Sequence, residues 1–154
     1  HLLYGRDDAN LNERILREAT PDHDSMGAVY RELRCMQHAG QGPTINASNA
    51  DIAQACNQRL GQGGISPASV ACAVAVFREL GLIETRLLED AAFPRAIRVV
   101  NAQCKVELTD SVRYREGLDE MDVFRTFCQW ALESPECELR NRICAPILPD
   151  KVEE

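Results

Sequence analysis

The segment from Ser66 to Gly81, SPASVACAVAVFRELG, constrains the fold of this chain more than any other stretch. Ser66 is a good N-cap, Pro67 suits the first helical position because its missing N–H costs nothing there, and Gly81 favours a stop. Apolar side chains cover much of the helix circumference: Val70, Cys72, Ala73, Val74, Val76, Phe77 and Leu80. Such a helix is suited to burial against other helices.

Three further helices are predicted before this segment. Residues 7–19 have the periodicity of a short amphipathic helix, and residues 25–39 predict a second helix. A third helix should begin at Ser48 or Asn49, after a minimal strand at Thr44-Ile45.

Gly81 also marks a change from helical to strand-like sequence. The stretches LIETRLLE and AIRVVN predict a two-stranded hairpin, with Pro94 in the connecting loop, where it cannot interrupt strand pairing. The predicted elements follow the order of a winged helix-turn-helix, which is helix, short strand, helix, turn, helix, strand, wing and strand. We therefore expect a mainly α chain with a small β-hairpin, whose winged helix-turn-helix-like core spans about residues 25–101.

A long helix is predicted after the hairpin, over about residues 110–134. Its apolar side chains fall on one stripe, formed by Tyr114, Leu118, Met121, Phe124, Cys128 and Ala131. The opposite face is acidic. Pro135 should end this helix, so we expect residues 1–134 to form a single domain and residues 135–154 a poorly ordered tail.

The charge of the chain disfavours it as a whole as a nucleic-acid binder. The formal net charge is −7 over 154 residues, and phosphate contacts supply most non-specific nucleic-acid affinity. Residues 102–154 hold 7 basic and 12 acidic groups, whereas residues 44–101 hold 5 of each. The acidic excess therefore lies mostly at the C-terminal end.

The cysteines predict a reducing compartment. There are seven, an odd number without any C-x-x-C pair: Cys35, Cys56, Cys72, Cys104, Cys128, Cys137 and Cys144. This spacing favours free structural thiols over a zinc site or disulfides. No stretch reaches the roughly 18 apolar residues of a membrane span, so we expect a cytoplasmic protein without membrane contact.

No catalytic constellation is predicted. Asp22-His23-Asp24 could pass for a metal-binding triplet, but adjacent side chains diverge and the triplet falls in a turn between helices. Ser66 and Ser111 precede helices and are typical of caps, not nucleophiles. We expect no catalytic residue, cofactor or metal in this chain.

Only a few side chains could contact DNA or a partner. A DNA-reading helix needs polar or basic side chains for base edges, but Ser66 to Leu80 offers only Arg78, beside Glu79. The predicted wing adds Arg86, Arg95 and Arg98, although three scattered arginines are also typical of a solvated surface. These four arginines are the candidate contact residues, and we expect them to serve protein contact or grazing DNA contact.

Three passages together resemble a known family. They are, in chain order, HLLYGRDDANLNERIL, VFRELGLIE and VELTDSVRYREGLDEM. Together they are similar to the C-terminal accessory region of the bacterial RecJ family of single-strand-specific DNA exonucleases. The similarity is to the form of this region that carries an added winged-helix-like module. The last passage places Leu108, Ser111 and Tyr114 before an acidic helix. The resemblance covers the chain to about residue 134.

The resemblance implies an accessory role. The parent protein would remove nucleotides from 5′ ends in recombination and repair, with manganese or magnesium in a catalytic core whose motifs are missing here. This region would dock on that core and contact single-strand-binding protein or single-stranded DNA. The alternative is a free-standing winged-helix transcriptional regulator with a C-terminal dimerisation helix, which the uncharged reading helix disfavours.

Overall fold

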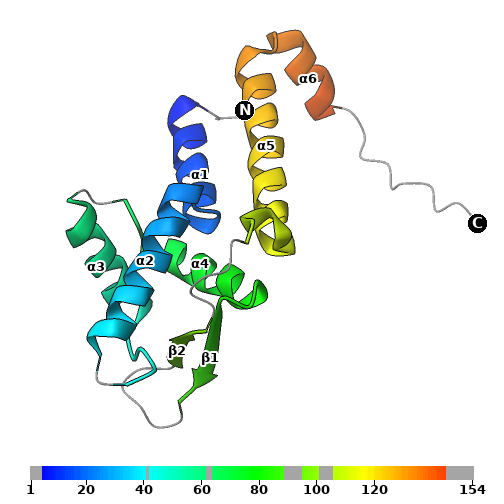
Figure 1. Cartoon of the computed structure of the whole chain (residues 1–154). Helices are drawn as coiled ribbons and strands as arrows, with labels where there is room; N and C mark the ends of the chain where they lie inside the picture. Colours follow the sequence, from blue (N-terminus) through cyan, green and yellow to red (C-terminus); the bar gives the residue numbers. More distant parts are fainter. Residues whose placement is uncertain (1–4, 41, 62–63, 89–94, 101–105, 145–154) are drawn as a thin grey trace, which may run out of the picture.

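The computed structural model describes residues 5–40, 42–61, 64–88, 95–100 and 106–144. The described chain is mainly helical with one small antiparallel hairpin, as the sequence predicts (Figure 1). The elements are α1 (Arg6–Ala19), α2 (His23–Ala39), α3 (Asn49–Leu60), α4 (Pro67–Glu79), β1 (Ile83–Leu87), β2 (Arg95–Val99), the 3-10 helix η1 (Leu108–Asp110), α5 (Val112–Glu133) and α6 (Glu136–Cys144).

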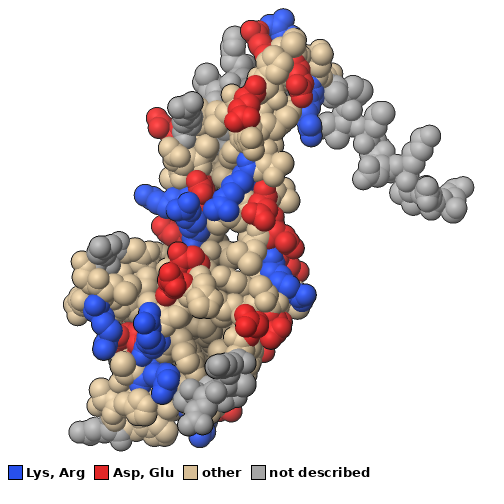
Figure 2. All heavy atoms as spheres, turned by 45° about the horizontal axis from the view of Figure 1, so that its top comes forward, with Lys and Arg blue, Asp and Glu red and all other residues tan. Residues whose placement is uncertain are grey.

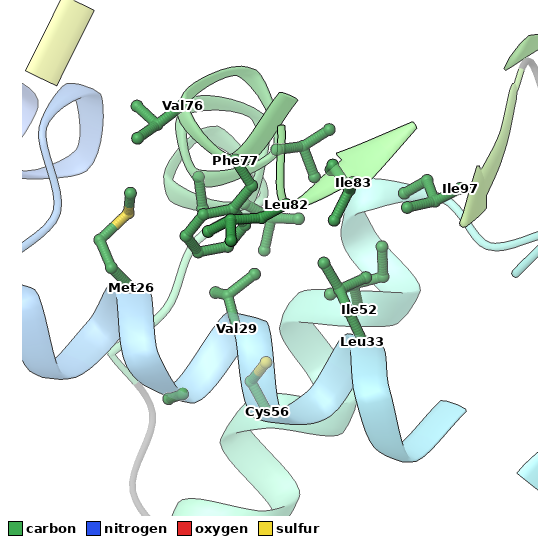
Figure 3. Close-up of a cluster of buried hydrophobic side chains, with 14 of the residues drawn as sticks. Met26, Val29, Leu33, Ile52, Cys56, Val76, Phe77, Leu82, Ile83 and Ile97 are labelled. Atoms are coloured by element: carbon green, nitrogen blue, oxygen red, sulfur yellow. The ribbon is translucent and has the colours of Figure 1, made fainter. Parts of the chain in front are cut away.

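Helix α4 lies at the centre of the core, as its all-round apolar sequence requires. Its residues Val70, Ala73 and Val76 are fully buried. Phe77 packs edge-on against Tyr30 of α2, with ring centroids 5.3 Å apart. Figure 3 shows side chains of α2, α3, α4 and the hairpin converging on this region.

The hairpin contacts the rest of the chain through backbone or side-chain hydrogen bonds at two points. Ile45, just before α3, forms an isolated antiparallel bridge with Ile97 of β2. The side-chain amide of Gln37 on α2 donates to the Val99 carbonyl and accepts from its N–H. Gly81 has a φ of +69°, a left-handed conformation that glycine adopts without strain and that turns the chain from α4 into β1. The elements from α2 to β2 thus follow the predicted order, while their assignment to the winged helix-turn-helix class stays a prediction.

Helix α5 is attached to the C-terminal end of α4 by a polar contact through the exposed Glu79. Glu79 of α4 accepts hydrogen bonds from Ser111 Oγ at 2.8 Å and from the Val112 N–H at 2.6 Å. Ser111 also caps α5 by accepting from the Tyr114 N–H. These bonds to the carboxylate lower the pKa of Glu79 below its ordinary value. The start of α5 is therefore held by side chains, with Tyr114 and Met121 buried behind it.

Helices α1 and α5 lie side by side and rise together from the core (Figure 1). Gly117 of α5 allows their close approach, because Thr20 at the end of α1 occupies the space where a β-carbon would lie. About two turns before Thr20 in α1, Glu13 pairs with Arg125 of α5 at 3.5 Å. Within the predicted apolar stripe of α5, Tyr114 and Met121 are buried and Leu118 is exposed. The other three residues of the stripe are half-buried: Phe124, Cys128 and Ala131.

The prediction of a poorly ordered tail from residue 135 was wrong for its first part, because residues 136–144 form α6. A proline that ends one helix can also begin the next, and the first turn of α6 carries Glu136 and Glu138, which favour a helix N-terminus. Residues 145–154 lie outside the described residues.

Candidate functional site

The four candidate arginines separate into two pairs. Arg86 and Arg98 are exposed on one face of the hairpin, where Arg98 lies opposite Glu84 and pairs with it at 3.9 Å. Arg95, at the start of β2, lies on the other face and donates to Asn49 Oδ1 at the start of α3. Burial, and then the nearby charge of Arg78, lower the pKa of Arg95. The described strands of the wing therefore offer no single basic patch.

The surface of α4 provides little that could read DNA bases. Its exposed residues are Pro67, Ala68, Ala71, Arg78 and Glu79. Glu79 is occupied by the start of α5, so Arg78 is the one exposed hydrogen-bond donor among the side chains of this helix. Base-specific recognition needs several polar side chains directed at base edges. The geometry of α4 thus agrees with burial rather than with insertion into a DNA groove.

A basic cleft that the sequence did not predict lies between α2 and α3. Its volume is about 450 Å³, and it is lined by Ala28, Arg31, Glu32, Arg34, Cys35, His38, Cys56, Arg59 and Leu60. Three arginines face one glutamate here, and basic side chains gather over this part of the surface in Figure 2, at its lower left. Within the described chain, Arg31 and Arg34 take part in no ion pair.

An ion pair across the two helices organises the cleft. The Glu32 side chain is only 6% exposed, and its carboxylate accepts from Arg59 Nε at 2.7 Å. This bond and the charge of Glu32 raise the pKa of Arg59. Arg59 itself is 61% exposed, so the rest of its guanidinium group faces solvent. The buried glutamate thus holds an accessible arginine in a defined position.

A sequence signal for the cleft existed but is weak. Arg31, Arg34, Cys35 and His38 recur at the three- and four-residue spacing of one helical stripe. A basic stripe on a helix is usually just solvated, and only the packing of α3 brings Arg59 against it.

A second, larger hollow between α1, α4 and α5 is electrostatically balanced. Its volume is about 1010 Å³, and three arginines line it. Each of them is paired with an acid: Arg14 with Glu18, Arg17 with Glu13, and Arg125 with Glu13 and Asp122. It therefore offers less unpaired positive charge than the α2–α3 cleft.

Most of the residues considered for catalysis act as helix caps. Asp22 caps α2 by accepting from the Ser25 N–H at 2.8 Å, and the His23 side chain is directed into solvent. Ser66 and Ser111 cap α4 and α5, as predicted. Among the described residues, no three His, Cys, Asp or Glu side chains are grouped as metal ligands.

Two aromatic residues near the end of α5 contact each other. The ring centroids of Phe127 and Trp130 lie 5.9 Å apart. Trp130 donates to Glu138 of α6 at 3.0 Å, and the Arg142 guanidinium lies 4.7 Å above the Trp130 ring. In this region α5 extends beyond the body that α4 and the hairpin form (Figure 1). Trp130 therefore contacts α6 there.

The thiols of the described residues are free, namely Cys35, Cys56, Cys72, Cys128, Cys137 and Cys144; Cys104 lies outside these residues. Burial, and then the charge of Glu32, raise the pKa of Cys56 to about 11. No described helix combines the length and apolar character needed to cross a lipid bilayer.

Comparisons of this chain with profiles of known protein families, with curated proteins and with solved structures found no match.

Proposed function

We propose that this chain is the non-catalytic C-terminal accessory domain of a single-strand-specific 5′–3′ DNA exonuclease of recombination and repair, of the RecJ type. The passages that carry the resemblance lie at α1, at the α4–β1 junction and at η1 with the start of α5. The single observation that supports a docking role best is the burial of α4, which leaves Arg78 as its one exposed donor.

Docking on the nuclease core would use the outer side of α1. Leu11 and Ile15 lie one helical turn apart and are 51% and 55% exposed, respectively. Exposed apolar side chains on one helix side are suited to a protein interface. The divalent metal ions of the reaction would be bound by the nuclease core and not by this domain. The domain would act in the cytoplasm, where its thiols stay reduced.

Partner contact is the second part of the proposal. Single-strand-binding protein, or single-stranded DNA leaving the core, would meet the basic surfaces of the domain. The predicted contacts are Arg78, Arg86, Arg95 and Arg98, which the hairpin divides into two separate pairs. Such a divided surface fits transient contact better than sequence-specific binding.

The test of docking uses the domain and the separately expressed nuclease core. Titration should show binding that weakens when Leu11 and Ile15 are changed to Ser. Leu87→Ser is the matched control, because Leu87 is 82% exposed at the hairpin and lies outside the proposed interface. Equal weakening by the control, or no binding at all, would refute docking through α1.

The absence of catalysis is tested with 5′-labelled single strands and manganese. The isolated domain should leave the strands intact, because neither its sequence nor its described residues provide a catalytic constellation. Metal-dependent shortening that persists through repurification would contradict the proposal.

A transcriptional regulator is the alternative, and one feature of α5 favours it. Val123 is 70% exposed on this long helix, which would suit a dimerisation surface. A regulator would bind a particular duplex on the order of 10³-fold more tightly than unrelated DNA. Titration with duplex libraries at physiological salt distinguishes the two, since the accessory domain should show no such preference.

A further inference from the structure

Helix α6 presents two cysteines on one side. Cys137 and Cys144 are both exposed, and Cys144 follows Cys137 by about two helical turns, so the two side chains leave the helix in nearly the same direction. Asn141 is exposed between them on the same side. These three residues form the thiol face of α6.

Another side of α6 is held against α5. Glu138 accepts a hydrogen bond from Trp130 Nε1 at 3.0 Å, and the Arg142 guanidinium lies 4.7 Å from the centroid of the same ring. Both side chains leave α6 about 100–140° away from Cys137, because each residue turns the helix by about 100°. The thiol face is therefore directed to solvent, at the end of α5 that lies away from the core (Figure 1).

The two thiols of this face cannot bond to each other within one chain. Their positions on α6 are separated by ~10.5 Å along the helix, whereas the Cα atoms of a disulfide lie about 4.4–6.8 Å apart. Cys128 of α5 is directed elsewhere, since it lies about 160° around that helix from Trp130, which contacts α6. A disulfide of the thiol face therefore needs a thiol from another molecule.

A second copy of the chain would supply the matching thiols. When two α6 helices pack antiparallel about a two-fold axis between positions 140 and 141, Cys137 of each copy lies opposite Cys144 of the other. Helix axes ~10 Å apart leave ~5.4 Å between facing Cα atoms, because these atoms lie about 2.3 Å from each axis. This separation is within the range that a disulfide spans.

The charge and size of α6 suit an association that depends on the disulfides. Arg140 lies next to the axis, and Glu136 neutralises it by an ion pair at 2.8 Å. Asn141 is uncharged and can hydrogen-bond to its symmetry mate. The helix has nine residues, too few for the ~800 Å² per partner of a standard stable interface. Reduced copies should therefore stay apart.

We propose that Cys137 and Cys144 form a reversible oxidation site, which links two copies of this chain through two disulfides between antiparallel α6 helices. The oxidant is a peroxide. The thiolate of one cysteine attacks hydrogen peroxide, the O–O bond breaks, and a sulfenic acid and water form. The thiolate of the facing cysteine attacks this sulfur, the S–S bond forms, the S–O bond breaks, and a second water leaves. Each disulfide thus oxidises two thiols and reduces one hydrogen peroxide to two water molecules.

This site does not depend on the proposed accessory role. In a reducing cytoplasm the link would be transient, as is usual for cytosolic disulfides that respond to oxidants.

The first experiment treats the full chain with hydrogen peroxide and separates the products by electrophoresis without reductant. A dimer should appear that dithiothreitol converts back to monomer. Cys137→Ser and Cys144→Ser should each lose the dimer, because every disulfide of the antiparallel pair needs one cysteine of each kind. Cys35→Ser is the matched control, since Cys35 is half-buried on α2, and it should dimerise like the unaltered protein.

A mixture of the two single variants provides the decisive comparison. Cys144 of one variant and Cys137 of the other should form a dimer with one disulfide, which also shows that both variants are folded. Trypsin cleaves after Arg140 and Arg142, so the two cysteines fall in different peptides and mass spectrometry identifies the linked pair. The proposal would be overturned by absence of a dimer from the unaltered protein, by dimers that persist in either single variant alone, or by links between two identical cysteines.

Discussion

Gly117 of α5 provides the sharpest test of how the helices pack. A β-carbon at this position would lie 2.1 Å from Thr20 Oγ1, 2.9 Å from Cγ2 and 3.0 Å from Cβ. These separations are too short for real contacts, so Gly117→Ala must displace Thr20 or separate α1 from α5. The prediction is that this substitution destabilises the protein although alanine is the better helix former.

Gly27 supplies the matched control, because it also lies inside a helix. No atom lies within 4 Å of a β-carbon built at Gly27, so Gly27→Ala should raise the free energy of unfolding by about 1 kcal/mol through helix propensity alone. Gly117→Ala has the same gain but adds an overpacking cost of about 1–3 kcal/mol. The two variants should therefore differ by about 1–3 kcal/mol.

Urea unfolding, followed by circular dichroism and by the fluorescence of the single Trp130 on α5, measures this difference. The double variant Thr20→Ala/Gly117→Ala should recover most of the loss relative to Thr20→Ala, because only the 3.0 Å approach to the Thr20 β-carbon remains. If Gly117→Ala stabilises as much as Gly27→Ala, the close packing of α1 on α5 is refuted.

Three further predictions concern caps and thiols. Glu79→Gln should destabilise the protein at pH 7: because the folded-state pKa of Glu79 is lowered, its stabilisation is present above the ordinary value and lost as pH falls. The difference from the unaltered protein in urea unfolding should close below about pH 4, and a difference independent of pH would contradict this role. Ser111→Ala should cost about 1–2 kcal/mol in the same assay, since it removes the cap of α5 and a donor to Glu79, and an unchanged midpoint would refute the cap. Alkylation of the native protein at pH 8, followed by mass spectrometry, should modify the exposed Cys137 and Cys144 first and Cys56 last, because Cys56 is buried and its pKa is about 11; early modification of Cys56 would show that α2 and α3 open readily.

The sequence by itself determined most of the local structure. The Ser-Pro start of α4, its all-round apolar surface and the glycine at position 81 predicted a buried helix followed by a strand, and the structure has both. The stripe with Tyr114 and Met121 likewise identified the buried side of α5. These signals arise from capping and from periodicity within a few residues, and such interactions are present before any tertiary contact forms.

Only the tertiary structure decided which of these faces meet. Glu32 and Arg59 are 27 positions apart, and no local pattern shows that α3 places Arg59 opposite the basic stripe of α2. Gly117 gave no sequence signal of its own, because its role depends on Thr20 of a helix almost a hundred residues away. Periodicity shows that a helix has an apolar side, but the element that covers it is chosen by the shape and charge of the whole fold, and the cleft between α2 and α3 is a product of that choice.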